Sequence, residues 1–167
     1  MAEMLSRGAT IDELESLYRE ELPRFVRAAA AIVDDEAAGR DAVQEAFVQA
    51  VRKRASFRFE SPLEAWVWRI VINEALALRR RRASEFERDS ESATTPSTNG
   101  VPEHDAAVRA WVAALPERQR LAVFLRYFAD LDYQSIAIAL GVEVGTVSAT
   151  LATAHAALRR SYQEAVQ

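Results

Sequence analysis

The residues best suited to chemistry lie between positions 52 and 70, where basic residues are interspersed with aromatic residues in RKRASFRFESPLEAWVWRI. Arg and Lys side chains can neutralise phosphates, and Phe and Trp rings can stack on unpaired bases. Phe57 and Trp68 have polar neighbours, so an exposed stacking role and a buried core role are about equally favoured. Trp66 and Ile70 have a helical spacing that is typical of core packing. The segment as a whole indicates a nucleic-acid contact.

Residues for catalysis or for holding a cofactor are scarce. The only histidines are His104 and His155, and no Ser-His-Asp arrangement, HExxH motif or glycine-rich phosphate loop accompanies them. The absence of cysteine excludes disulfides and thiolate metal sites. The acidic residues near position 35 are more typical of a solvated face than of a metal site. We expect no enzymatic activity, no cofactor and no metal.

The charge of the chain is segregated along the sequence. Although the formal net charge is −4, residues 46–82 carry nine basic and only three acidic side chains. A basic segment in an acidic chain predicts a localised contact with a polyanion. The run Arg79–Arg82 alone would fit a solvated helix end, where cations complement the helix dipole. It gains weight because it continues the same expected helix as Arg69 and Asn73.

Helices must position these residues, since Ala, Leu, Arg and Glu are common while Gly and Pro are scarce. Residues 11–25 carry apolar side chains at helical spacing, with Pro23 as an expected kink or break. A second, amphipathic helix is expected over residues 43–51. A third is expected to begin with Ser61 as its N-cap and to run through residue 82.

Two small helical domains are expected, joined by a flexible acidic linker. Residues 84–106 are rich in Ser, Thr, Pro and acidic side chains, with almost nothing to bury. This places one domain at residues 11–83 and the other at residues 107–163. In the second domain, Gly141 and Val147 favour a helix-turn-helix over a plain helical hairpin, because that motif needs a left-handed turn residue and an apolar plug. The fold class is therefore all-α.

No part of the chain resembles a membrane anchor or an export signal. Its apolar runs fall short of the roughly 18 residues that cross a bilayer. The first 15 residues lack the apolar stretch of a signal peptide. We therefore expect a cytoplasmic protein without stable membrane insertion.

Three segments in this order resemble bacterial extracytoplasmic-function (ECF) sigma factors, which are initiation subunits of RNA polymerase. They are RDAVQEAFVQAVRKRASF, PLEAWVWRIVINEALALRRRR and LPERQRLAVFLRYFADLDYQSIAIALGVEVGTV, and the likeness covers about residues 12–82 and 107–162. The family consists of two helical domains, domain 2 and domain 4. The resemblance implies that the chain binds core RNA polymerase and promoter DNA, and that an anti-sigma factor or another regulator controls it.

The resemblance assigns roles to residues of domain 2. Asp41, Gln44 and Glu45 correspond to the surface that docks on the β′ clamp of the polymerase, whereas the helical spacing of Phe47 places its ring in the core. The loop at residues 55–61 and Asn73 correspond to the pocket for a flipped non-template base of the −10 element, since an Asn amide suits a base edge. The implied DNA contacts of this domain are Arg54, Phe57, Arg58, Phe59, Trp68, Arg69, Asn73, Arg79 and Arg80.

Domain 4 would bind the β flap and place its second helix in the major groove at the −35 element. Family members usually carry Lys, Arg or His after GTV, but here small and hydroxylated residues follow, with His155 on the same face and Glu143 at the N-cap position. Without Arg or Lys, the bidentate contact to guanine is lost. Hydroxyls, methyls and the helix N-terminus can still contact phosphates and thymine. We expect weak reading by Thr146, Ser148, Ala149, Thr150 and Thr153.

The clamp motif also departs from the family. Members often carry a DAED-like acidic run, and residues 38–41 of this chain read AGRD instead. One carboxylate remains and a cation has entered. The clamp contact is therefore expected to be weaker, or to rely on the acidic residues at positions 34–36.

We interpret the chain as an ECF-type sigma factor that directs RNA polymerase to promoters and assists melting by binding the separated strands. One alternative is a sigma-like adaptor or decoy that binds polymerase or a regulator without reading promoters. The neutral recognition helix favours this alternative slightly, and the basic, aromatic first domain disfavours it. A dimeric helix-turn-helix repressor is disfavoured because the first domain has no signature of a ligand pocket or of dimerisation.

Overall fold

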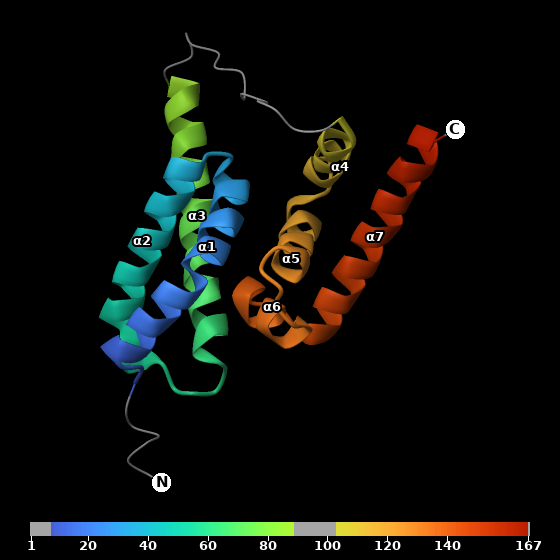
Figure 1. Cartoon of the computed structure of the whole chain (residues 1–167). Helices are drawn as coiled ribbons and strands as arrows, with labels where there is room; N and C mark the ends of the chain where they lie inside the picture. The colour runs from blue at the N-terminus through green and yellow to red at the C-terminus, as the bar shows by residue number, and fades with distance from the viewer. Residues whose placement is uncertain (1–7, 89–102, 167) are drawn as a thin grey trace.

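The computed structural model describes residues 8–88 and 103–166 (Figure 1). All regular elements in these two ranges are helices, which confirms the all-α prediction. They are α1 (Ile11–Val33), α2 (Glu36–Lys53), the short 3-10 helix η2 (Arg54–Ser56), α3 (Leu63–Arg88), α4 (Glu103–Ala113), α5 (Glu117–Tyr127), α6 (Tyr133–Leu140) and α7 (Val144–Val166).

Helix α1 begins with a capping box and runs without a break. The Thr10 hydroxyl accepts a hydrogen bond from the N–H of Glu13 at 3.1 Å, and the Glu13 carboxylate accepts one from the N–H of Thr10 at 2.7 Å. The helix continues through Pro23 to Val33, so the expected break does not occur. Pro23 is exposed, and its carbonyl accepts a hydrogen bond from Nε of Arg27 at 3.3 Å.

The first unit is formed by α1, α2 and α3, which pack around a cluster of aromatic rings. The ring centroid of Phe25 lies 5.5 Å from that of Phe47 and 4.4 Å from that of Trp68. All three side chains are buried, and burial of each such side chain contributes about 1.5–3 kcal/mol. The core position expected for Phe47 is confirmed.

Helix α3 starts later and ends later than the sequence predicts. Its first hydrogen bond joins the N–H of Trp66 to the carbonyl of Pro62 at 3.2 Å, so Pro62 rather than Ser61 occupies the cap position. The helix then runs to Arg88, because residues 83–88 are mostly good helix formers. The rest of the predicted linker before α4, residues 89–102, lies outside the described residues.

The second unit is formed by α5, α6 and α7, with α4 packed on α7. Asp132 caps α6 by accepting a hydrogen bond from the N–H of Ser135 at 2.7 Å. Gly141 ends α6 in the left-handed conformation, with φ = 65°, as the sequence predicts. Val147 of α7 is buried together with Ile136 of α6, which fixes the angle between the two helices. The helix-turn-helix prediction is confirmed.

The two units touch each other through α3 and α6, which lie side by side in Figure 1. Their buried side chains form one connected cluster. Within the described ranges, no single helix is both long and apolar enough to cross a membrane. Helices α6 and α7 reach that limit only as a pair, across the 99° bend between them.

Candidate polymerase and nucleic-acid interfaces

One face of α2 presents polar side chains that have no partner in the described part of the chain. Asp41, Gln44 and Glu45 are exposed, with helical spacings of three and four residues. The opposite face of α2 is buried in the core of the first unit. Val48 extends the polar face and is 42% exposed, although sequence reasoning did not include it. Its position four residues after Gln44 was the available signal.

The acidic residues that precede this face are used within the fold. Asp35 caps α2 by accepting a hydrogen bond from the N–H of Ala38 at 2.7 Å, and its other oxygen lies 3.3 Å from Arg82. These two interactions, the Ala38 hydrogen bond first, hold the pKa of Asp35 below its ordinary value. Asp34 ends α1 with a left-handed backbone. The Asp35 carboxylate is therefore a poor substitute for the missing clamp carboxylates.

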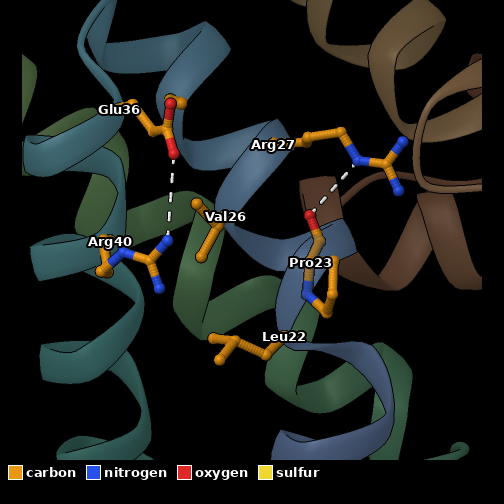
Figure 2. Close-up of a pocket in the computed structure, with 7 residues that line it drawn as sticks. Leu22, Pro23, Val26, Arg27, Glu36 and Arg40 are labelled. Atoms are coloured by element: carbon orange, nitrogen blue, oxygen red, sulfur yellow. Dashed lines mark hydrogen bonds and ion pairs between the residues drawn. The ribbon is translucent and has the colours of Figure 1, made fainter.

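The cation that enters the clamp motif is paired on its own helix. Arg40 lies 3.9 Å from Glu36, one turn away, along the α2 wall of a groove between α1 and α2 (Figure 2). Leu22, Pro23 and Val26 of α1 form the apolar wall of this groove. The charge of Arg40 is thus partly offset before it can act on the neighbouring Asp41.

The loop between α2 and α3 holds one aromatic ring in the core and displays another. Phe57 is 5% exposed, so its expected stacking role is wrong. Its ring centroid lies 5.4 Å from that of Trp66, which packs the loop against α3. Phe59 is 47% exposed and lies 4.7 Å from Phe57 between ring centroids. Its φ of 58° is rare for a bulky residue. Such strain is typical of functional positions.

Trp68 is also buried, which corrects its expected role in DNA binding. It is fully inaccessible, packs on Phe25 and donates a hydrogen bond from Nε1 to the Glu64 carboxylate at 3.3 Å. Trp66, expected in the core, is only partly buried. The physical reason is helical register: Trp68 shares its face with Ile72 and Ala75, whereas its polar neighbours in sequence point elsewhere.

The outer side of α3 carries the polar and basic residues that the sequence singles out. Arg69, Asn73 and Arg80 are exposed, and their spacings of four and seven residues place them along one side of the helix. Asn73 has no hydrogen-bond partner within the two described ranges. It follows Trp66 by seven residues, roughly 10 Å along the helix axis. The pocket expected from the loop at residues 55–61 and Asn73 stays a prediction.

The remaining basic residues differ in whether they have a partner within the fold. Arg54 is half-buried and donates a hydrogen bond to the carbonyl of Val51 at 2.8 Å. Arg58 and Arg80 are exposed and have no ion pair in the described part of the chain. Arg79 lies 2.6 Å from Glu117 of α5, an interaction between the two units that sequence reasoning missed.

The exposed face at the start of α7 is neutral. Thr146, Ser148, Ala149 and Thr153 are exposed, while Thr150 is half-buried. The Thr153 hydroxyl donates to the carbonyl of Ala149 at 2.9 Å, which leaves only its lone pairs for DNA. Glu143 precedes α7 at the N-cap position, as expected, and its carbonyl accepts hydrogen bonds from the N–H groups of Thr146 at 3.0 Å and Val147 at 3.2 Å.

His155, expected on the same face, is engaged elsewhere. It is half-buried and forms a 2.9 Å hydrogen bond with the Tyr127 hydroxyl of α5. The face that α7 can offer to DNA therefore consists of small side chains.

Known proteins match the chain over both units. The family model described as Sigma-70 region 2 matches residues 17–85, and the one described as Sigma-70, region 4 matches residues 105–158. The RNA polymerase sigma-H factor of Pseudomonas aeruginosa is 33% identical over 147 residues, which cover 78% of this chain and 76% of that protein. The chain belongs to the ECF sigma factors.

Further relatives agree with this membership. The ECF RNA polymerase sigma-E factor of Escherichia coli is 31% identical over 143 residues, covering 76% of this chain and 75% of that protein. Two solved structures share the fold at TM-scores of 0.71 and 0.70, with 22% and 23% identity. One is the sigma factor RpoE of Bartonella quintana with the anti-sigma factor NepR, covering 92% of this chain and 98% of that one. The other is CnrH with the cytosolic domain of CnrY, covering 93% and 91%.

As an ECF sigma factor, the protein directs RNA polymerase to promoters, and it is not an enzyme. Its work is done by binding. This argues against the repressor and adaptor alternatives. The exposed polar faces of α2 and α3 and the neutral face of α7 are the surfaces in this sigma factor that remain to be assigned to individual partners.

Proposed function

We propose that the exposed face of α2 docks on the β′ clamp of core RNA polymerase through Asp41, Gln44, Glu45 and Val48. The support is that these side chains are exposed together and have no partner within the described ranges, whereas the opposite face of α2 is buried in the core. Val48 adds apolar area at the edge of the polar face. The clamp contact then combines charge with a small buried surface.

Promoter melting rests on a track along α3 and the loop before it. Phe59 stacks on an unpaired base of the −10 element, because its ring is displayed by a left-handed backbone and backed by Phe57. Asn73 contacts the edge of a nearby base, and Arg69 and Arg80 hold the phosphates between them. The exposed, strained Phe59 is the observation that carries this proposal.

Domain 4 contributes position more than sequence reading. It docks on the β flap and lays α7 at the −35 element, where hydroxyls and methyls touch phosphates and thymines. The protein acts in the cytoplasm, where polymerase and promoters are found. An anti-sigma partner is supported by the two structural neighbours, whose titles describe complexes with NepR, named as an anti-sigma factor, and with CnrY.

The test is run-off transcription with core polymerase on a promoter library, followed by Phe59→Ala and Asn73→Ala. Both variants should slow open-complex formation much more than closed-complex binding, because an unpaired base exists only after melting. A promoter with a pre-melted bubble should rescue them. Phe86→Ala is the matched control, since Phe86 is an aromatic of α3 that is 56% exposed and lies outside the proposed track.

Two results would contradict the melting proposal. Equal loss of duplex binding and opening in Asn73→Ala would make Asn73 structural. Opening rates of Phe59→Ala that match those of Phe86→Ala would remove Phe59 from the proposed track.

A further inference from the structure

The two residues before the cap of α1 lie against the start of the loop between α2 and α3. The N–H of Ala9 donates a hydrogen bond to the carbonyl of Arg54 at 3.0 Å. Gly8 comes closer still, because a Cβ added there would lie 2.1 Å from the Arg54 carbonyl oxygen and 2.5 Å from Cα of Ala55. Residues 8–9, termed the strap below, therefore cross the chain where α2 passes into η2, beside the first turn of α1 (Figure 1).

The strap leaves no room for a side chain at position 8. A Cβ atom does not approach other heavy atoms within 3.0 Å, and the atoms that it would meet here belong to the backbone of Arg54 and Ala55, which cannot rotate away. The backbone of Gly8 is not left-handed, so its glycine serves close approach and not an unusual dihedral angle. A Cβ at Gly145, by comparison, would meet nothing within 4 Å. Contact with the loop is thus the reason for glycine at position 8.

Helix α1 fixes the strap in place. The capping box of Thr10 and Glu13 begins at the residue that follows the strap. Ala9 is buried, with 4% of its surface exposed. The strap is therefore a rigid extension of α1 that reaches the loop.

The strap contacts the part of the loop that supports Phe59. The carbonyl of Arg54 accepts hydrogen bonds from two N–H groups, that of Ala9 and, at 3.2 Å, that of Phe57. The ring of Phe57 in turn backs the exposed ring of Phe59 at 4.7 Å between centroids. Within the two described ranges, residues 58–61 make no backbone hydrogen bond. The placement of Phe59 therefore depends on the anchored turn before it.

We propose that Gly8 is a positioning residue for promoter opening: the strap holds the turn from Arg54 to Phe57, so that Phe59 is displayed before an unpaired base arrives. This role rests on the proposed stacking of Phe59 on a −10 base. A loop that is ordered in advance has less conformational entropy to lose when it captures the base. A loop that is correctly placed in only a fraction of molecules captures the base less well by that fraction.

The first experiment measures amide hydrogen exchange by NMR on the full chain without DNA. Gly8→Ala must displace the strap, and loss of one hydrogen bond should make the amides of Ala9 and Phe57 exchange about 2- to 12-fold faster. The amide of Val43, in the middle of α2, should exchange as in the wild type. Gly145→Ala is the matched control, because it adds the same methyl group in open space and should leave all three amides unchanged.

The second experiment measures open-complex formation by the holoenzyme. Gly8→Ala should slow opening by about 2- to 12-fold, the same factor by which the ordered loop is lost. Affinity for core polymerase and closed-complex binding should not change. The double variant Gly8→Ala with Phe59→Ala should open no more slowly than Phe59→Ala alone, because Gly8 acts through Phe59. A glycine that served only the packing of the chain would give effects that add.

The outcomes separate the strap from the proposed function. Unchanged exchange at Ala9 and Phe57 in Gly8→Ala overturns the proposal, and so does loss of helical circular dichroism, since Gly8 would then support the whole unit. Faster exchange with wild-type opening in Gly8→Ala, or additive effects in the double variant, also overturns the positioning role. If Phe59→Ala opens normally while Gly8→Ala exchanges faster, the stacking proposal fails but the strap still holds the loop. Faster exchange with slower, non-additive opening supports both.

Discussion

A single arginine on the recognition helix should change how the protein binds DNA. Ala149 is exposed on the neutral face of α7, between Ser148 and Thr150. Ala149→Arg adds one phosphate or guanine contact where the native helix offers none. Each neutralised phosphate adds about 0.9 to the slope of log affinity against log salt. Raising salt from 50 to 200 mM should therefore cost the variant roughly 3.5-fold more affinity than the wild type.

The assay is promoter binding by holoenzyme at several salt concentrations, with and without a scrambled −35 element. The difference between variant and wild type removes the contribution of polymerase. Ala149→Gln controls for side-chain length, and Ala165→Arg controls for charge near the end of α7. In the wild type, scrambling the −35 element should cost about one mismatch, or 1–3 kcal/mol at most. An unchanged slope in Ala149→Arg, or a large scrambling penalty in the wild type, would refute a weakly reading helix.

Three further predictions address the clamp face, the core and a helix cap. Gln44→Ala with Glu45→Ala should weaken binding to core polymerase in a pull-down titration without changing the helical circular dichroism. Trp68→Ala should lower the free energy of unfolding, measured in urea, by about 3–5 kcal/mol, because it empties a fully buried site. Phe86→Ala should change the free energy of unfolding by less than about 0.5 kcal/mol. Asp132→Ala should cost about 1 kcal/mol at pH 7 through loss of the α6 cap.

The effect of Asp132→Ala should depend on pH with a definite sign. Hydrogen bonds from Ser135, its backbone N–H first, hold the pKa of Asp132 below the ordinary 3.8. A lowered pKa means that the carboxylate stabilises the fold fully above pH 3.8, and that this stability is lost as pH falls through the lower folded value. The gap between wild type and variant should narrow below about pH 4. If the difference in stability between wild type and Asp132→Ala persists below pH 4, the difference comes from packing and not from the charged cap.

Further controls keep the other two predictions specific. Glu85→Ala with Glu87→Ala removes exposed charges from α3, outside the α2 clamp face, and should leave polymerase affinity intact. If the α2 double variant behaves like this control, the α2 face is not the clamp surface. A small loss of stability in Trp68→Ala would contradict its place in the core.

The sequence predicts best what local chemistry decides. The turn at Gly141 needs a left-handed residue and the angle between the helices needs the apolar Val147, so the helix-turn-helix could be predicted directly. The buried side of α2, with Phe47, follows from apolar spacing alone. These features depend on residues within one or two turns of each other.

Errors arose where the neighbours in space are not the neighbours in sequence. The polar residues beside Trp68 suggested exposure, but the facing ring of Phe25 comes from α1 and decides its burial. Residues 84–88 have little to bury, yet helix-forming side chains carry α3 through them. The pair Arg79–Glu117 joins two units, and no local pattern predicts it.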